Sequence, residues 1–195
     1  MKNRPPVLSA ILLAAGLSSR MGTDKLLLEY KGLPLFQHSL DLLGKLPVNK
    51  RILVTTEARL AGVFIHKSVK IKLCTKPEKG QSESIRLGVE ATHGIPTHYL
   101  FLQADQPNLT VNDIKQLLNA ATANPDKIIF PVINNQPNSP TIFPFQYRLD
   151  LLNLTGDNGG RIIRENNMEN SLGIKMDTPI NFTDIDTMED FNDIV

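Results

Sequence analysis

The chain has 195 residues, of which 41% are hydrophobic and 21% are charged, a composition typical of a globular protein with a sizeable core. A net charge of +1 argues against nucleic-acid binding, which usually needs a strongly basic face, and no apolar run approaches the length of a membrane span. We expect a single domain over residues 1–195. Cys74, the only cysteine, has no disulfide partner and is expected to be buried.

The first apolar run, residues 7–15, has two interpretations. Lys2 and Arg4 before it and the small residues at its end resemble a short secretory signal. Pro5 and Pro6 fit that pattern poorly, and cleavage would separate the run from the polar loop that follows it. We therefore expect the run to be a buried strand in a cytoplasmic protein.

Short apolar runs alternate with amphipathic stretches along the whole chain. The length of the runs and their β-branched residues favour buried parallel strands. We expect strands at residues 7–14, 51–55, 69–73, 99–103, 128–132, 141–143 and 172–176. We expect helices at residues 35–46, 82–92, 111–123, 145–152, 159–166 and 187–194.

This strand–helix order predicts an α/β fold, a three-layer α/β/α sandwich with a mostly parallel sheet. Residues 133–143 are expected to add an irregular or antiparallel insertion. Because ligands of such sheets bind at the carboxyl ends of the strands, the polar residues that follow each strand are the first candidates for a site.

The segment Leu13–Lys25, which follows the first strand, has the composition of a phosphate-binding loop. Gly16 and Gly22 allow tight turns that bring backbone N–H groups close to an anion, and Arg20 and Lys25 supply positive charge for a polyphosphate. The spacing fits neither a Walker A loop nor the dinucleotide motif G-x-G-x-x-G. We interpret the segment as a nucleotide-binding loop; the alternative is an ordinary basic turn between a strand and a helix.

Carboxylates occur at two places where a metal ion is plausible. Asp105 ends a hydrophobic strand, which suits Mg²⁺, or it caps or precedes the helix that starts near Val111. Near the C-terminus, Asp184 and Asp186 point to opposite sides of an extended segment, so one of them is positioned to supply a second ligand. Asp186 or Thr187 is also a candidate cap for the last helix.

Two further glycine-bearing segments precede helices. In Gly80–Arg86, Ser82 is a natural N-cap, or the hydroxyls and free N–H groups of the segment bind a polar ligand. In Gly156–Arg161, either Asp157 caps the helix or Arg161 completes an anion site.

Taken in this order, the segments resemble the nucleotidyltransferases of molybdenum-cofactor maturation, and most closely the molybdenum-cofactor cytidylyltransferase branch. The matching segments are Leu13–Lys25 (LAAGLSSRMGTDK), Gly80–Arg86 (GQSESIR), Asp105–Pro107 (DQP), Gly156–Arg161 (GDNGGR) and Asp184–Asp190 (DIDTMED). The resemblance implies a Rossmann-like nucleotidyltransferase domain. It also implies Mg²⁺-dependent attack of a substrate phosphate on the α-phosphate of a nucleoside triphosphate, with release of pyrophosphate.

The resemblance implies site residues as well. Arg20, Lys25 and Asp105 would be catalytic, and Asp105 and Asp186 would hold Mg²⁺. Ala15, where guanylyltransferase relatives usually carry glycine, and the serine-bearing segment from Gln81 point to CTP. The nucleotide-binding residues would be Leu13, Ala14, Ala15, Gly16, Ser18, Arg20, Lys25, Gln81, Ser82 and Ser84.

The implied reaction transfers CMP from CTP to the phosphate of molybdopterin or molybdenum cofactor and forms molybdopterin cytosine dinucleotide. The chain departs from the branch at Gln81, where methionine is common, and at residues 138–140, where Gly-x-Pro is frequent. Two alternatives stay open. One is a transferase of the same fold that uses GTP or a sugar or alcohol phosphate. The other is a non-catalytic factor that binds the cofactor and delivers it to a client molybdoenzyme.

Overall fold

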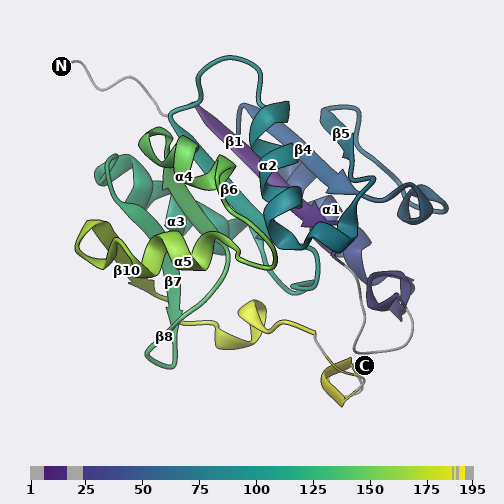
Figure 1. Ribbon diagram of the computed structural model, residues 1–195. Coiled ribbons are helices and arrows are strands. Elements are labelled where there is room, and N and C mark those ends of the chain that lie inside the picture. Colours follow the sequence, from purple (N-terminus) through teal and green to yellow (C-terminus); the bar gives the residue numbers. More distant parts are fainter. Residues whose placement is uncertain (1–6, 17–23, 186, 188, 192–195) are drawn as a thin grey trace.

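The structure is a computed structural model that describes residues 7–16, 24–185, 187 and 189–191. An eight-stranded sheet forms its centre (Figure 1), with strand order β10-β7-β9-β6-β1-β4-β5 and β8 paired to β7. The strands are β1 (Leu8–Ala14), β4 (Lys50–Thr55), β5 (Val69–Leu73), β6 (His98–Gln103), β7 (Ile128–Ile133), β8 (Gln136–Pro137), β9 (Thr141–Pro144) and β10 (Ser171–Lys175).

Strand β1 lies at the middle of the sheet because it is apolar on both faces. It pairs in parallel with β4 and with β6, and all seven of its residues are buried. Ala10 and Leu12 belong to the core on one face, whereas Ile11 and Leu13 belong to the core on the other. This alternation follows from the two-residue period of a strand.

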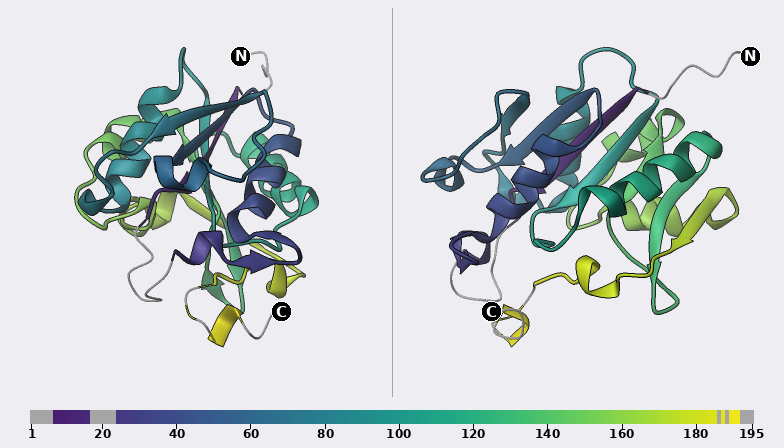
Figure 2. Two further views of the ribbon diagram at one scale, coloured as in Figure 1. Left: turned by 90° about the vertical axis from the view of Figure 1, so that its right-hand side faces the viewer. Right: turned by 180° about the vertical axis from the view of Figure 1, so that it is seen from behind.

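Helices cover both faces of the sheet. In Figure 1, α2 (Gln81–Ala91), α4 (Arg148–Leu152) and α5 (Gly160–Glu165) lie in front. The view from behind in Figure 2 shows α1 (Leu35–Lys45) and α3 (Val111–Ala123) on the opposite face. The predicted three-layer α/β fold with a mostly parallel sheet is confirmed.

Strand β9 is the antiparallel member of the main path, as the sequence allowed for residues 133–143. It pairs antiparallel with both β6 and β7, and β8 pairs antiparallel with β7. Asn134 and Asn135 reverse the chain between β7 and β8 with φ angles of 50° and 63°, a left-handed conformation that asparagine tolerates well.

Two local predictions need correction. A small hairpin, β2 (Glu29–Tyr30) and β3 (Leu33–Pro34), was not expected; Lys31 and Gly32 close it with positive φ angles, as a two-residue hairpin turn requires. The single helix predicted over residues 145–152 is a 3₁₀ turn, Phe145–Tyr147, followed by α4. Cys74 is buried, as predicted.

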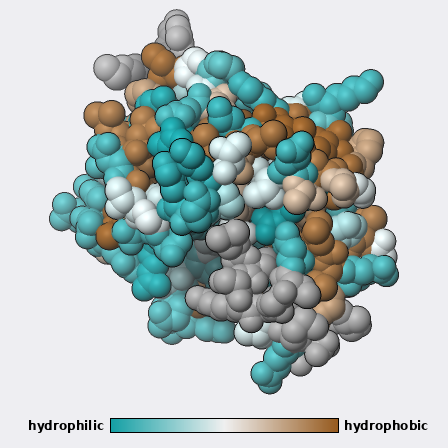
Figure 3. Space-filling view, turned by 45° about the vertical axis from the view of Figure 1, so that its right-hand side comes forward, coloured by the Kyte–Doolittle hydropathy of each residue, from teal (hydrophilic) through white to brown (hydrophobic). Residues whose placement is uncertain are grey.

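The surface gives little indication of a site by itself. Hydrophilic and hydrophobic residues both occupy large areas of the face in Figure 3, which is normal because apolar atoms make up about half of most protein surfaces. Within the described part of the chain, no helix is long and apolar enough to span a membrane. Pockets and buried charges are therefore the more informative features.

Candidate active site

Two adjoining pockets lie at the carboxyl ends of the central strands. The first, which we call the nucleotide cleft, has a volume of about 350 Å³. Its lining comprises Leu13, Gly16, Lys25, Leu26, Pro77, Glu78, Gly80, Gln81, Ser84, Gln103, Ala104, Asp105 and Asp157. The second, which we call the arginine pocket, has a volume of about 340 Å³ and shares Leu13, Gln81 and Gln103 with the cleft.

Most of the predicted site residues that the structure describes line the nucleotide cleft. Leu13, Gly16, Lys25, Ser84 and Asp105 all line it, although they come from distant parts of the chain. They converge because β1 and β6 are parallel neighbours, so that their carboxyl ends lie at the same edge of the sheet.

Not every predicted residue reaches the cleft. Ala14, Ala15 and Ser82 are buried and are not among its lining residues. Ser18 and Arg20 lie outside the described residues.

The central contact of the cleft joins Lys25 to Asp105. Lys25 begins a 3₁₀ turn that ends at Leu27, and its Nζ lies 2.8 Å from Oδ2 of Asp105. Lys25 Nζ also donates to the carbonyl of Ile185 at 2.8 Å. The other carboxylate oxygen, Oδ1 of Asp105, is buried and has no hydrogen-bond partner among the described residues.

The helix-cap alternative for Asp105 is wrong. The N-cap of α3 is Thr110, whose hydroxyl oxygen accepts from the N–H of Asp113 and whose own N–H donates to the Asp113 carboxylate. Because the capping box leaves no such role for Asp105, its carboxylate is available at the edge of the sheet.

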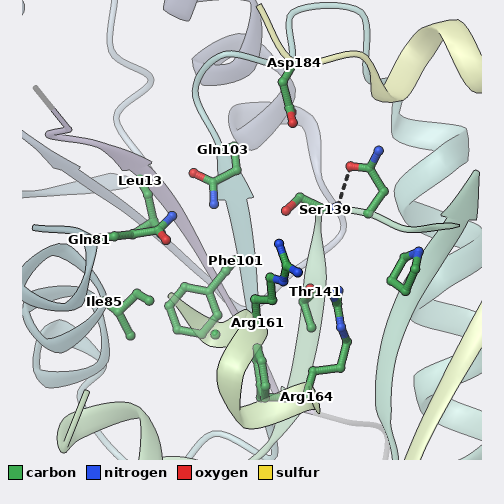
Figure 4. A pocket seen from close by; sticks show the side chains of 14 residues that line it. Leu13, Gln81, Ile85, Phe101, Gln103, Ser139, Thr141, Arg161, Arg164 and Asp184 are labelled. Carbon is green, nitrogen blue, oxygen red and sulfur yellow. Dashed lines mark hydrogen bonds between the residues drawn. The ribbon is translucent and has the colours of Figure 1, made fainter. Parts of the chain in front are cut away.

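The C-terminal segment is held against the residues that follow β6. Ile185 N–H donates to the carbonyl of Asp105 at 3.1 Å, and the buried Gln106 side chain donates to the carbonyl of Phe182 at 3.2 Å. Asp184 lies between these contacts and lines the arginine pocket (Figure 4). Gln106 was missed in the sequence reading, although it belongs to the DQP segment.

Asp184 is thus described at the site, whereas Asp186, the predicted second metal ligand, lies outside the described residues. Thr187 and Asp190 form reciprocal capping bonds of 2.8 and 3.1 Å, which confirms the capping role for Thr187. No group of three or more His, Cys, Asp or Glu residues able to hold a metal ion is found in the described ranges.

A buried arginine that the sequence analysis missed holds both ends of the phosphate loop. Arg59, only 4% exposed, donates to the carbonyls of Ala14 at 2.6 Å and Gly16 at 2.8 Å. Its Nε lies 2.6 Å from Oδ2 of Asp24, next to Lys25. Arg59 follows β4, the parallel neighbour of β1, and that position was the available signal.

The wall between the pockets is formed by two glycine-rich segments in contact. Ser82 N–H donates to the carbonyl of Gly156 at 3.1 Å, and a side chain at Gly80 would clash with Gly156 and Asp157. The predicted helix caps are wrong here: α2 is capped by Gly80 rather than Ser82, and α5 by Gly159 rather than Asp157. The glycines permit close packing of this wall, which places Gln81 in both pockets.

The arginine pocket contains two guanidinium groups from α5. Arg161 is exposed and its Nε lies 2.6 Å from Glu165 Oε1. Arg164 is only 7% exposed. Burial lowers the pKa of the Arg164 guanidinium, because removal from water disfavours the charged form.

Comparison with known proteins identifies the family of the chain. Residues 10–171 match the model of the MobA-like NTP transferase domain. A probable molybdenum cofactor guanylyltransferase of Rhodopirellula baltica is 35% identical over 130 residues, which span 64% of this chain and 61% of that protein. The purine catabolism protein PucB of Bacillus subtilis is 29% identical over 97% of this chain and 96% of its own length.

Solved structures share the fold at lower identity. Rv0371c from Mycobacterium tuberculosis H37Rv superposes with a TM-score of 0.80 at 20% identity, over 98% of each chain. A structure of the same mycobacterial protein in complex with manganese has a TM-score of 0.77 at 19% identity, over 96% of this chain and 97% of that one. The family match covers most of the sequence, including Asp105 and β1 from Ala10 onward. The chain therefore belongs to the MobA-like NTP transferase family of nucleotidyltransferases, and it is related to a molybdenum cofactor guanylyltransferase.

Proposed function

We propose that this nucleotidyltransferase transfers CMP from CTP to the phosphate of molybdopterin or molybdenum cofactor, forming molybdopterin cytosine dinucleotide and pyrophosphate. One observation carries the proposal. Lys25 and Asp105 form an ion pair of 2.8 Å, and both line the same cleft as Leu13 and Gly16 at the start of the loop. A cation paired with a carboxylate that follows a central strand suits a triphosphate and its metal ion.

The proposed chemistry needs no side-chain nucleophile. An oxygen of the acceptor phosphate attacks the α-phosphorus of CTP, a new P–O bond forms, and the bond to the β-phosphate oxygen breaks as pyrophosphate leaves. Lys25 holds the triphosphate and stabilises the negative charge that develops on pyrophosphate. Gly16 and Leu13 border the path of the nucleotide, and Arg20 is proposed to add a second cation. Catalysis then rests on alignment and charge neutralisation.

The described residues fit a divalent cation. Oδ1 of Asp105 is a buried carboxylate oxygen without a hydrogen-bond partner among them, and Mg²⁺ prefers such hard oxygen ligands. We propose that Asp105 holds Mg²⁺ with a second carboxylate from Asp186 or from Asp184. When bound, the ion would neutralise charge on the α-phosphate. The manganese complex of the mycobacterial structure supports a divalent ion in this fold.

The choice of CTP rests on Ala15, near the start of the Leu13–Lys25 loop, and on the first residues of α2. Ala15 is buried beside the cleft, where guanylyltransferases usually carry glycine, and Gln81 and Ser84 line the cleft. A second candidate is GTP, because the Rhodopirellula relative is named a probable guanylyltransferase. We propose a client molybdoenzyme as the recipient of the product.

The test is pyrophosphate release by the purified chain with Mg²⁺ and molybdenum cofactor, with CTP and GTP compared at equal concentration. We expect faster release with CTP, and we expect Ala15→Gly to reduce that preference. Preference for GTP would overturn the base assignment and keep the reaction class. Absence of release with either nucleotide and active cofactor would reject the proposed acceptor, and a panel of sugar and alcohol phosphates would then be tried.

A further inference from the structure

Arg164 is a buried cation that forms no ion pair with any residue that the structure describes. Its side chain makes no hydrogen bond and no ion pair with any described residue, and its Nε is buried and without a partner. Its guanidinium lies over the ring of Phe130, 4.8 Å from the ring centre. A cation–π contact of this kind offsets only part of the cost of removing a charge from water.

Arg161 provides the contrast within the same helix. It lies three residues earlier, it is exposed, and its charge is matched by Glu165 at 2.6 Å. Evolution of a purely structural α5 would favour the same solution at position 164, or an apolar residue there, because an unmatched buried charge destabilises the fold. The arrangement at Arg164 is explained if an anion binds to it.

The arginine pocket offers space for such an anion next to Arg164. Arg164 lines the arginine pocket together with neutral hydrogen-bonding groups, including Asn138, Ser139 and Thr141. Figure 4 shows Asp184 at one end of the pocket and Arg164 at the other, with Gln103 near the aspartate. A ligand that fills the pocket therefore extends from the side of the nucleotide cleft, marked by Gln103, to the guanidinium.

We propose that Arg164 is an anion-binding residue and that it holds a negatively charged group of the acceptor substrate. The group is a phosphate or a carboxylate, the anions that a guanidinium binds best, and it is distinct from the phosphate that reacts near Asp105. The identification of the ligand as the acceptor rests on the proposed function, whereas the anion site rests on the burial and contacts of Arg164.

The kinetic test compares Arg164→Gln with Arg164→Lys and Arg161→Gln in pyrophosphate release. A hydrogen bond to a charged group contributes about 1.5–3 kcal/mol, which corresponds to about 10–150-fold in affinity. We expect Arg164→Gln to raise the acceptor KM at least about tenfold while the CTP KM changes less than about twofold. Arg164→Lys should raise the acceptor KM less than Arg164→Gln does, because it keeps a positive charge. Arg161→Gln should also raise the acceptor KM less than Arg164→Gln does. An unchanged acceptor KM, or equal increases for acceptor and CTP, would overturn the proposal.

A binding test separates this inference from the proposed function. Inorganic phosphate and acetate are titrated into the Lys25→Ala variant, which lacks the lysine of the nucleotide cleft and so binds anions there more weakly. The arginine Nε–H signals are followed by NMR, and the signal of Arg164 is assigned by its loss in Arg164→Lys. A saturable shift of that signal with either anion supports the site even if no nucleotide is turned over. If neither anion shifts the Arg164 signal, the anion site is refuted, even if pyrophosphate release succeeds.

Discussion

The nucleotide cleft and the arginine pocket share a wall, but they differ in how their basic side chains are paired. In the cleft, Lys25 is paired with Asp105, and the neighbouring Arg59 joins Asp24 to the carbonyls of Ala14 and Gly16 at the start of the loop. In the arginine pocket, Arg164 is buried with no ion pair among the described residues. The cleft is organised by contacts within the protein, whereas we propose that the charge of Arg164 is matched by a bound anion. Preorganised charges suit catalysis, and an unmatched charge suits recognition.

The largest effect is expected when the charges of the cleft are removed. Lys25→Ala and Asp105→Ala should each reduce pyrophosphate release at least about a hundredfold, because loss of one preorganised electrostatic contact raises the barrier by about 3–4 kcal/mol. Lys127→Ala is a matched control, since Lys127 lies before β7 and lines neither pocket. Unfolding curves check that the variants are folded, and near-normal turnover in either variant would remove that residue from the mechanism.

The shared wall should depend on Gly80. Gly80 and Gly62 both have positive φ angles, 83° and 77°, but a Cβ at Gly80 would lie 2.5 Å from the Gly156 carbonyl, whereas a Cβ at Gly62 would meet nothing within 4 Å. We expect Gly62→Ala to lower the free energy of unfolding by about 1–2 kcal/mol and Gly80→Ala by at least about 1–3 kcal/mol more. Denaturant unfolding measures the difference, and equal losses would show that the wall is not tightly packed.

The buried charge of Arg164 should lower the stability of the fold in the absence of a bound anion. Arg164→Met removes it while preserving an unbranched side chain against Phe130, and we expect the free energy of unfolding to rise by about 1 kcal/mol or more. Arg161→Met, at an exposed position of the same helix, should change it by less than about 0.5 kcal/mol. Chemical unfolding in an anion-free buffer is the measurement. A marked loss of stability in Arg164→Met would show that Arg164 is structural.

The smallest effect concerns acid sensitivity outside both pockets. His98, at the start of β6, is buried, and its pKa is lowered because desolvation disfavours the protonated ring. The unfolded chain then binds more protons than the folded one between the lowered pKa and about 6.5, so stability should fall as the pH falls below about 6.5. Unfolding at pH 7.5 and 5.5 tests this, and His98→Gln should flatten the dependence. An unchanged slope in that variant would assign the acid sensitivity to other groups.

Much of the fold could be predicted because its signals are local. The predicted bounds of α3 and β5 match the structure, since capping residues, apolar periodicity and β-branched runs act over a few residues. The meeting of Lys25 with Asp105 was also predictable, because a parallel sheet brings the carboxyl ends of its strands to one edge. The helix caps at Ser82 and Asp157 were predicted wrongly, since Gly80 caps α2 and Gly159 caps α5. The reason is tertiary: Gly80 packs closely against Gly156, a residue far along the chain.

The sequence by itself determined the α/β order and the placing of a carboxylate just after β6, because each depends on neighbouring residues. Two arginines are buried in the described part of the chain, Arg59 and Arg164, and their contacts were decided by the tertiary structure. Both are arginines in short helical turns, and nothing in the adjacent sequence distinguishes them. Desolvation and pairing depend on groups far along the chain: Arg59 meets the ends of the phosphate loop, whereas Arg164 meets the face of Phe130 and a pocket.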